Sequence, residues 1–482
     1  MIQNDTGATL LLEKELDSNS LISPFFWRQQ ASHKVRSDWV WGFVTTKYDP
    51  DIAGSVTVIP MFHGTNKPTE FALLRGFEVH DGEPLTVGDW NGDGRNELIV
   101  VDWEGQQRAF GFGGRPLETV ALMPSNANLV KHQPRVVDVN GDGRSELVFL
   151  SMDAPLAGGV SMLSISDASG KPLPGLPLEL DPPSVSPMVI ASGQSGAKRL
   201  VFVREDGEVS VYETKNRHLY NVASVSPNAA RNVSIAAADL NSDGEDEIFI
   251  ATGSDSLDCI VVGPTAVSPD SMFEREHSAI VAVASGLKRD GSSVVCFYDQ
   301  TFRQFGFLWA SHLSWVPHMT SGLHQRLVSL SRYPATGKGG DIFVATFFEP
   351  ATNRDVETVF EKRATPEMRK ALTESPPEED AGDQRPELMR FLLIENFGER
   401  KVDEMLLQPA TMEVCLLDSD GNVVGGAPVR ISGVHPFVEE DETCVLRPAV
   451  LYDKKKLFLL IGFYEDTADC AAYVRMYEVP YS

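Results

Sequence analysis

The feature that most constrains the fold of this chain is an acidic loop that occurs three times in nearly the same form. The three segments are VGDWNGDGRNELIVV at 87–101, VDVNGDGRSELVFLS at 137–151 and ADLNSDGEDEIFIATG at 238–253. Each contains D-x-N-x-D-G-x-x-E followed by Leu or Ile, and the first Asp stands at 89, 138 and 239, that is, 49 and 101 residues apart. A unit of about 50 residues therefore repeats, and one unit without the motif lies between the second and third copies.

An apolar anchor follows each acidic loop and recurs along the rest of the chain without the acids. In the unit that lacks the motif, the acidic positions become Ala191, Ser195 and Arg199. A partial ninth copy around Trp41 would help to close a ring. The anchors are Leu98, Leu147, Leu200, Ile248, Val295, Ile342, Met405 and Leu457.

Short strands rich in Val, Ile and Phe lie between these anchors and are separated by Gly, Asp, Asn and Pro turns. Repeating units of this length with three or four short strands are typical of propeller blades, whereas a parallel β-helix has a much shorter repeat. We therefore predict an all-β fold with a single β-propeller, eight blades being preferred and seven possible.

The domain organisation follows from the same repeat. The 482 residues exceed one ordinary core, but the repeat predicts one ring over 37–482 after an N-terminal extension at 1–36. The long step from Ile342 to Met405 predicts a short helical and acidic insertion between blades at 352–388. Within it, Thr365 before Pro366 is a helix-start signal, and the helix should end near Thr373. The insertion is either a partner-binding arm or a tolerated surface insertion.

The three acidic loops carry the donor chemistry of a hard cation. Side-chain oxygens alternate along each loop, a Gly at the sixth position permits the chain to reverse, the carbonyl at the seventh can add an oxygen, and the ninth-position Glu closes the loop. Oxygen ligation without His or Cys suits a hard cation, and Ca²⁺ is favoured over Mg²⁺ because a flexible carboxylate loop can supply about six or seven ligands. Up to three structural calcium ions are predicted. The predicted ligand positions are Asp89, Asn91, Asp93, Arg95 and Glu97; Asp138, Asn140, Asp142, Arg144 and Glu146; and Asp239, Asn241, Asp243, Glu245 and Glu247.

An EF-hand begins in a similar way but requires a Glu at its twelfth position, where this chain has Val100, Phe149 and Ile250. The spacing instead resembles the calcium loops of FG-GAP/VCBS repeats, as in integrin α-subunit propellers, although that family usually has Asp at the ninth position. The resemblance covers residues 89–250. It implies a seven- or eight-bladed propeller with calcium in the loop between the first strands of a blade. The alternative is that the loops hold a turn by internal hydrogen bonds alone. Other units fold without the ligands, since Gly286, Lys288 and Val294 replace three of them in one copy.

Charge and motifs exclude several function classes. With 42 basic and 68 acidic residues the formal net charge is −26, which argues against nucleic acid and anionic membrane surfaces as partners. The apolar run at 457–464 is too short to span a bilayer, so no membrane insertion is expected. The chain has no nucleophile elbow, P-loop, HExxH or Rossmann glycine pattern. The six-residue spacing of His312, His318 and His324 fits no common metal helix. We expect no catalytic residues and no enzyme activity.

These observations predict a non-enzymatic, calcium-binding propeller that acts as a protein–protein interaction scaffold. The alternative is a calcium-dependent, lectin-like propeller that binds a glycan, and a polysaccharide lyase is a less favoured third. Five widely spaced cysteines without a CxxC pair and the lack of a leader favour an intracellular location, whereas calcium loops also suit an extracellular one.

Overall fold

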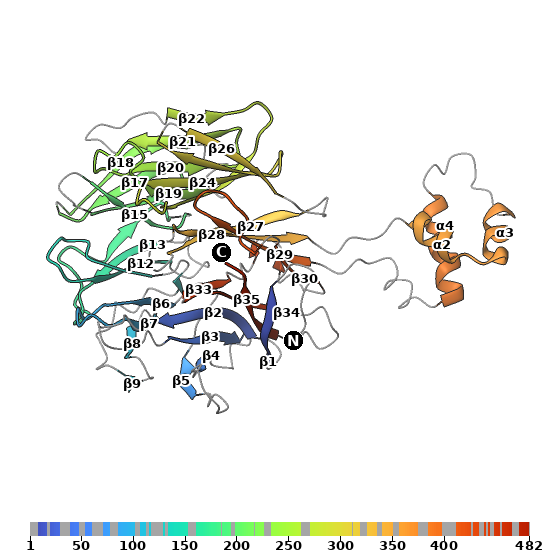
Figure 1. The fold of residues 1–482 in the computed structure, drawn as a ribbon, viewed down its shortest axis with the longest axis horizontal. Helices are drawn as coiled ribbons and strands as arrows, with labels where there is room; N and C mark the ends of the chain where they lie inside the picture. Colours follow the sequence, from blue (N-terminus) through green and yellow to red (C-terminus); the bar gives the residue numbers. More distant parts are fainter. Residues whose placement is uncertain are drawn as a thin grey trace.

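Short antiparallel strands, most of them in groups of four, account for most of the residues that the structure describes (Figure 1). The computed structural model describes residues 8–16, 20–28, 39–47, 54–59, 71–77, 85–101, 107–111, 115–116, 129–130, 134–152, 161–184, 186–193, 198–215, 217–225, 233–261, 270–310, 312–318, 325–334, 340–349, 356–374, 384–397, 411–425, 428–432, 438–439, 442–443, 448–453, 456–464 and 472–481. The chain is mainly β and forms a single β-propeller with a few short helices, as the repeat predicted.

Seven blades are built from strands that follow one another in the chain, and they are numbered here in chain order. Blade 1 contains β2 (Ser20–Arg28), β3 (Trp39–Lys47), β4 (Gly54–Ile59) and β5 (Phe71–Phe77). Blade 2 contains β6 (Leu85–Gly88), β7 (Glu97–Val101), β8 (Gln107–Gly111) and β9 (Arg115–Pro116). Blade 3 contains β10 (Leu129–Val130), β11 (Arg135–Val137), β12 (Glu146–Met152), β13 (Ser161–Ser166) and β14 (Leu178–Leu180). Blade 4 contains β15 (Val189–Ser192), β16 (Lys198–Val203), β17 (Glu208–Glu213) and β18 (His218–Ser224).

The remaining three blades follow the same order of strands. Blade 5 contains β19 (Ser234–Ala238), β20 (Glu247–Ala251), β21 (Ser256–Val261) and β22 (Asp270–Glu274). Blade 6 contains β23 (Ile280–Leu287), β24 (Ser293–Asp299), β25 (Gln304–Trp309) and β26 (His312–Pro317). Blade 7 contains β27 (Arg326–Tyr333), β28 (Ile342–Glu349), β29 (Thr411–Asp418) and β30 (Val429–Ser432).

A further four-stranded sheet joins the two ends of the chain. It contains β33 (Ala449–Asp453), β34 (Lys456–Tyr464), β35 (Ala472–Val479) and, at its edge, β1 (Thr9–Leu16). β1 pairs antiparallel with β35, and this closing sheet also contacts β2 of blade 1. The propeller therefore has seven blades of consecutive strands, the second of the two predicted numbers and not the preferred eight. The closing sheet is a further sheet, made from both ends of the chain. A short pair, β31 (Val438–Glu439) with β32 (Glu442–Thr443), stands outside this pattern.

The closing sheet corrects the predicted domain boundary. The segment 1–36, predicted as an extension, contributes β1 to the closing sheet and β2 to blade 1. The segment around Trp41 is not a partial copy, because it forms β3 of a four-stranded sheet. The anchor predicted at Met405 lies outside the described residues, and β28 of blade 7 pairs instead with β29, which begins at Thr411.

The apolar anchors form the core between blades. Leu98, Leu200, Ile248 and Val295 are fully buried on the second strand of their blades. Leu147 is equally buried on β12, the strand that pairs with both β10 and β11 in blade 3. Each such side chain contributes about 1.5–3 kcal/mol when it is fully removed from water. Apolar clusters cross from blade to blade, as from blade 5 to blade 6 and from blade 7 to the closing sheet. The ring is therefore held by packing between neighbouring sheets.

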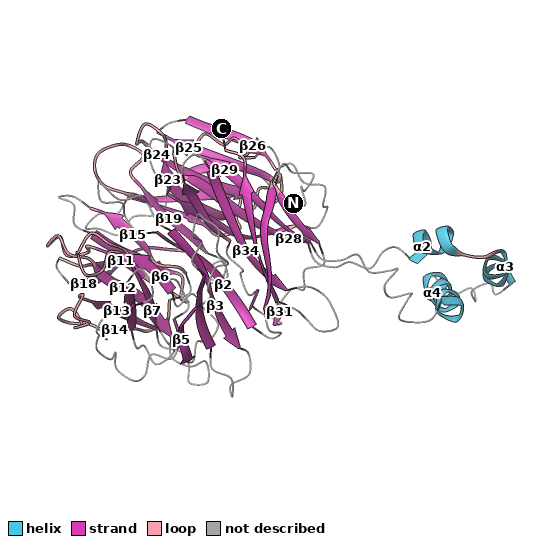
Figure 2. Ribbon diagram, turned by 60° about the horizontal axis from the view of Figure 1, so that its bottom comes forward, coloured by secondary structure: helices cyan, strands magenta, loops and turns pink. Residues whose placement is uncertain are grey.

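The insertion lies within blade 7, between β28 and β29, rather than between blades as predicted. It contains α2 (Val356–Arg363), α3 (Pro366–Glu374) and α4 (Gln384–Phe397), so it reaches beyond the predicted end at 388. The predicted helix start is confirmed, since Thr365 Oγ1 accepts the main-chain N–H of Met368 at 3.3 Å. In both views the three helices stand apart from the strands (Figures 1 and 2). Their shared core is formed by Phe360, Met368, Met389, Leu392 and Leu393.

Within the described residues, no helix is long and apolar enough to cross a bilayer. Cys259, Cys296 and Cys415 are buried. Cys444 and Cys470 lie outside the described residues.

Candidate metal-binding loops

The three acidic loops occupy equivalent positions in three blades. They connect β6 to β7 in blade 2, β11 to β12 in blade 3 and β19 to β20 in blade 5. In each case the loop follows the strand that precedes the buried anchor strand. Because corresponding strands of successive blades run in the same direction, the three loops lie at the same end of the ring.

The first loop is organised by hydrogen bonds from its own main chain. Asp89 accepts the N–H of Gly92 at 2.9 Å through Oδ1 and that of Gly94 at 3.0 Å through Oδ2. Asn91 Oδ1 accepts the N–H of Asp93, and Asp93 Oδ1 accepts the N–H of Arg95, both at 2.8 Å. Gly94 adopts a φ of 81°, in the left-handed region that Gly occupies at little cost. The alternating side chains therefore fold the loop around one point.

The second loop repeats these contacts. Asp138 accepts the N–H groups of Gly141 and Gly143 at 2.7 and 2.9 Å, and the Asn140 and Asp142 contacts are both 2.8 Å. The agreement extends to the glycines, since Gly143 has a φ of 83°.

The third loop keeps the pattern with one change. Asp239 accepts the N–H of Gly244 at 2.9 Å, and Asp243 accepts that of Glu245 at 2.8 Å. The residue at its fourth position is Ser242, which takes a positive φ of 62° where the other loops have Gly. The loop conformation is therefore maintained even at the strain that a non-glycine residue carries there.

A buried Glu closes each loop. Oε2 of Glu97 accepts the N–H of Trp90 at 3.0 Å, two residues into the loop. Glu146 accepts the N–H of Val139 at 3.0 Å, and Glu247 accepts that of Leu240 at 2.9 Å. Burial raises the pKa of all three carboxyl groups; the nearby Asp charges raise it further, and the main-chain hydrogen bonds partly oppose both effects. Each Glu therefore hydrogen-bonds back to the second residue of its loop, and its role as a metal ligand stays a prediction.

The donor chemistry of the loops fits a hard cation. Each loop has Asp at its first and fifth positions and Glu at its ninth, and the third loop adds Glu245 and Asp246. The Asn and Asp at the third and fifth positions face solvent in all three loops. A carboxylate oxygen that accepts one N–H retains acceptor capacity, so the hydrogen bonds described above do not exhaust the set. No cluster of three or more His, Cys, Asp or Glu side chains converges on one point in the part of the chain that the structure describes. A metal here would need Asn side-chain and main-chain oxygens as well, and the carbonyl roles of Arg95, Arg144 and Glu245 stay predictions.

The unit without the motif carries a basic residue where the others carry the ninth-position Glu. Arg199, which directly precedes the anchor Leu200, lies 3.9 Å from a carboxylate oxygen of Glu213 and 3.8 Å from one of Glu245 in the third acidic loop. Ala191 is buried, and Ser195 lies outside the described residues. Arg199 therefore supplies positive charge beside the neighbouring acidic loop.

A buried polar network between blades 6 and 7 has no signal in the sequence. His318, which follows β26, meets Oε1 of Glu413 on β29 through Nε2 at 3.0 Å, and its Nδ1 lies 3.1 Å from the Tyr298 hydroxyl. Arg430 Nε donates to Oε2 of Glu413 at 2.7 Å. The side chains of His318 and Glu413 are only 2% and 0% exposed, so this network joins blades rather than facing a substrate. His312 is exposed on β26, and His324 lies outside the described residues.

Comparisons with known proteins give a likeness of architecture only. No family model matches the chain, and no curated protein matches it. Among solved structures, BBS1N in complex with ARL6DN is similar at 11% identity and a TM-score of 0.41, over 83% of this chain and 93% of that one. AofleA from Arthrobotrys oligospora is similar at 14% identity and a TM-score of 0.33, over 63% of this chain and 89% of that one. At these values the likeness says nothing about the function of this chain.

Proposed function

We propose that this chain is a calcium-stabilised β-propeller that serves as a non-enzymatic platform for a protein partner. The observation that carries the proposal is that three loops with the same donor set adopt the same side-chain-to-main-chain geometry at one end of the ring. A turn needs only one or two acceptors to hold its shape, whereas each of these loops keeps three carboxylates and an Asn.

Charge is the physical reason for an ion in each loop. Three carboxylates within nine residues repel one another, and one of them is buried in each loop. Among the described residues, no salt bridge within 4 Å involves the acids at the first, fifth and ninth positions of the loops. In the third loop Glu245, at the seventh position, lies 3.8 Å from Arg199. A bound Ca²⁺ would take oxygens from the first, third and fifth positions and the ninth-position Glu. It would supply neutralising charge and join the two strands that flank the loop.

Two observations favour a binding platform over an enzyme. The buried His318–Glu413 pair, which has acid–base chemistry, is closed off between two blades. The chain also contains none of the local catalytic motifs described above. A propeller of this kind offers the loop-lined ends of the ring to a partner, and the strongly negative charge favours a partner with a basic surface.

Two tryptophans of blade 6 give the glycan-binding alternative little support. Trp315 packs edge-on against Phe297 and Phe273, with ring centroids 5.3 and 5.0 Å apart. The ring of Trp309 is covered by the ammonium group of Lys288, 3.9 Å from the ring centroid. Both rings are partly buried against apolar clusters of the blades, so their described contacts support packing rather than stacking on a sugar.

Thermal unfolding with and without calcium tests the metal part of the proposal. Protein stripped with EDTA should melt at a lower temperature than protein in millimolar Ca²⁺, because an ion at one hundred times its Kd adds about 2.7 kcal/mol per site. The variant D93N/D142N/D243N should lose this response. The matched control is Asp290→Asn, which changes the same fifth position in a loop that lacks three other ligands and should leave the response intact. Equal melting temperatures in EDTA and Ca²⁺ would refute the metal proposal.

The partner part needs a separate experiment. Full-length chain immobilised in Ca²⁺ should retain a defined protein from native extract, with a lower yield for D93N/D142N/D243N. Binding of the chain to a glycan array, with no protein retained from the extract, would instead favour the lectin-like alternative.

A further inference from the structure

The loop between β23 and β24 of blade 6 is the acidic loop with three ligands replaced. Its residues GLKRDGSSV at 286–294 align with DWNGDGRNE at 89–97. Asp290 and Gly291 remain at the fifth and sixth positions, and Gly291 keeps the positive φ, at 87°. Asp290 Oδ1 accepts the N–H of Ser292 at 2.9 Å, the contact that Asp93 makes with Arg95 in the first acidic loop. The turn therefore keeps this contact and the positive φ, although it has lost the ligand set. It is also tighter than an acidic loop, because β23 and β24 pair as far as Leu287 with Ser293, whereas β6 and β7 pair only as far as Gly88 with Glu97.

Packing explains why the first ligand is missing. A Cβ atom on Gly286 would lie 2.9 Å from the ring of Phe343 and 3.2 Å from the side chain of Asp341, both on or beside β28 of blade 7. An Asp at this position would therefore collide with the next blade. The close approach is fixed by a pair of hydrogen bonds, in which Leu287 N–H donates to Asp341 Oδ2 and Asp341 N–H donates to Leu287 O, both at 2.8 Å.

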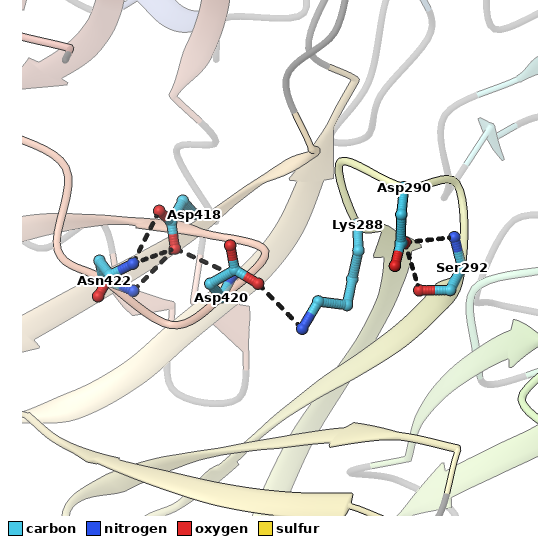
Figure 3. A network of polar contacts seen from close by, with 6 residues as sticks. All are labelled: Lys288, Asp290, Ser292, Asp418, Asp420 and Asn422. Atoms are coloured by element: carbon cyan, nitrogen blue, oxygen red, sulfur yellow. Dashed lines mark hydrogen bonds and ion pairs between the residues drawn. The ribbon is translucent and has the colours of Figure 1, made fainter.

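The third position carries a lysine that crosses to the same neighbouring blade. Lys288 Nζ lies 2.9 Å from Oδ1 of Asp420, which stands in the turn after β29 (Figure 3). The ammonium group also lies over the ring of Trp309, and the Lys288 side chain is only 15% exposed. A cation held between a carboxylate and an aromatic face is well placed for both charge and cation–π attraction.

The turn that receives Lys288 is itself built to hold its acid in place. Asp418 Oδ1 accepts the N–H groups of Asp420 and Asn422 at 3.0 and 2.8 Å. Asp418 also accepts the Asn422 side-chain amide, as the dashed lines of Figure 3 show. The Asp420 carboxylate is thus presented toward blade 6 by a turn with few alternative conformations.

We infer that Lys288 is a built-in cation that replaces the metal ion in blade 6. Its fixed ammonium group locks the junction between blades 6 and 7 through Asp420, with no dependence on calcium. The comparison with a metal rests on the calcium function proposed above, whereas the lock itself does not. Lys288 acts between two blades, whereas the ion proposed for each acidic loop would join two strands of the same blade.

Hydrogen exchange measured on the full chain tests this lock. Lys288→Met keeps the length of the side chain and removes its charge. It should speed the exchange of the Leu287 and Asp341 amides about tenfold, equally in EDTA and in Ca²⁺. Asp420→Asn should speed the exchange of these amides to the same extent. In the double variant the amides should exchange no faster than in either single variant. Lys288→Arg, which keeps the charge, should exchange close to wild type, and Lys171→Met is the control at an exposed turn lysine.

The outcomes separate the two proposals. The lock would be overturned by any of three results: additive effects of Lys288→Met and Asp420→Asn on amide exchange, unchanged exchange in both variants, or faster exchange seen only in Ca²⁺. If wild type shows no thermal response to Ca²⁺ while the two variants remain coupled, the calcium function fails and the lock stands. If wild type responds to Ca²⁺ but the variants are uncoupled, the lock fails and the calcium function stands.

Discussion

Removing the charge of Glu413 should weaken the ring measurably, because this carboxylate is fully buried and ties blade 6 to blade 7. Its Oε1 meets His318 Nε2 at 3.0 Å and its Oε2 accepts Arg430 Nε at 2.7 Å. Glu413→Gln keeps the shape of the side chain, so the change isolates charge from packing. The partners that remain are a buried imidazole and a guanidinium group that is 38% exposed.

The magnitude follows from these two contacts. A hydrogen bond to a charged group contributes about 1.5–3 kcal/mol, so the two together set an upper limit near 6 kcal/mol. The contribution of Arg430 is discounted, because a partly exposed guanidinium group can turn to water when its partner is lost. We expect a loss of about 2–4 kcal/mol. An unfolding entropy of about 2.1 cal/mol/K per residue turns this into a Tm lower by about 2–4 °C if the ring unfolds as one unit.

The pH dependence has a definite sign. Burial alone would raise the pKa of Glu413, but the hydrogen bonds and charges of His318 and Arg430 outweigh it and lower the pKa below its usual 4.5. A lowered carboxyl pKa stabilises the folded state above the unfolded value, and this stabilisation is lost as the pH falls through the lowered value. The difference between wild type and Glu413→Gln should therefore be constant near neutral pH and shrink below about pH 4.5.

Calorimetry of the full chain at pH 7 and pH 4 measures both effects. Glu395→Gln is the control, since Glu395 is an exposed residue of α4. It should change the Tm by less than about 0.5 °C. The stabilising role of the Glu413 charge would be contradicted if Glu413→Gln were as stable as wild type at pH 7. It would also be contradicted if the Tm difference between the two proteins grew on acidification.

Three further predictions concern the loops and the inserted helices. Gly143→Ala should cost about 1 kcal/mol in thermal unfolding, because Ala resists the φ of 83° there; no loss would contradict the turn geometry. Thr365→Ala should cost about 1 kcal/mol and speed exchange of the first amides of α3, since it removes the cap on the Met368 N–H; unchanged exchange would count against the cap. In EDTA, the Tm should rise as the pH falls from 7 toward 4.5, because raised carboxyl pKa values give the folded state more protons than the unfolded state. In Ca²⁺ the Tm should fall over the same range, because protons compete with the ion, and the same trend in both conditions would exclude the metal. The groups responsible are Glu97, Glu146 and Glu247.

The repeat predicted much of the fold because its pattern lies within short stretches of the sequence. Leu98, Leu147 and Leu200 stand at one fixed place relative to their turns, and each is a buried residue on the strand that follows its turn. The closing sheet has no such signature. Its β1 has the sequence TLLLEKEL and pairs with β35 more than 450 residues away, for example Thr9 with Glu478. The pairing of β1 with β35 depends on closure of the ring, and no short sequence pattern predicts it.

The same distinction separates the two kinds of site. Within an acidic loop, every organising contact joins residues at most seven apart, so the spacing alone predicted that Glu97 closes back onto the start of its loop. The His318–Glu413 contact joins residues 95 apart. The Lys288–Asp420 pair lies between different blades, and the sequence marked Lys288 only as a lost ligand. Such contacts depend on which blades become neighbours.

Isothermal titration calorimetry of Ca²⁺ into the EDTA-stripped chain tests most directly whether the three acidic loops are calcium sites. We expect three Ca²⁺ sites per chain, because three loops carry the complete donor set. Asp93→Asn, Asp142→Asn and Asp243→Asn should each remove one site, and Asp290→Asn should remove none. Binding absent at millimolar Ca²⁺, or binding that survives all three loop substitutions together, would contradict this expectation.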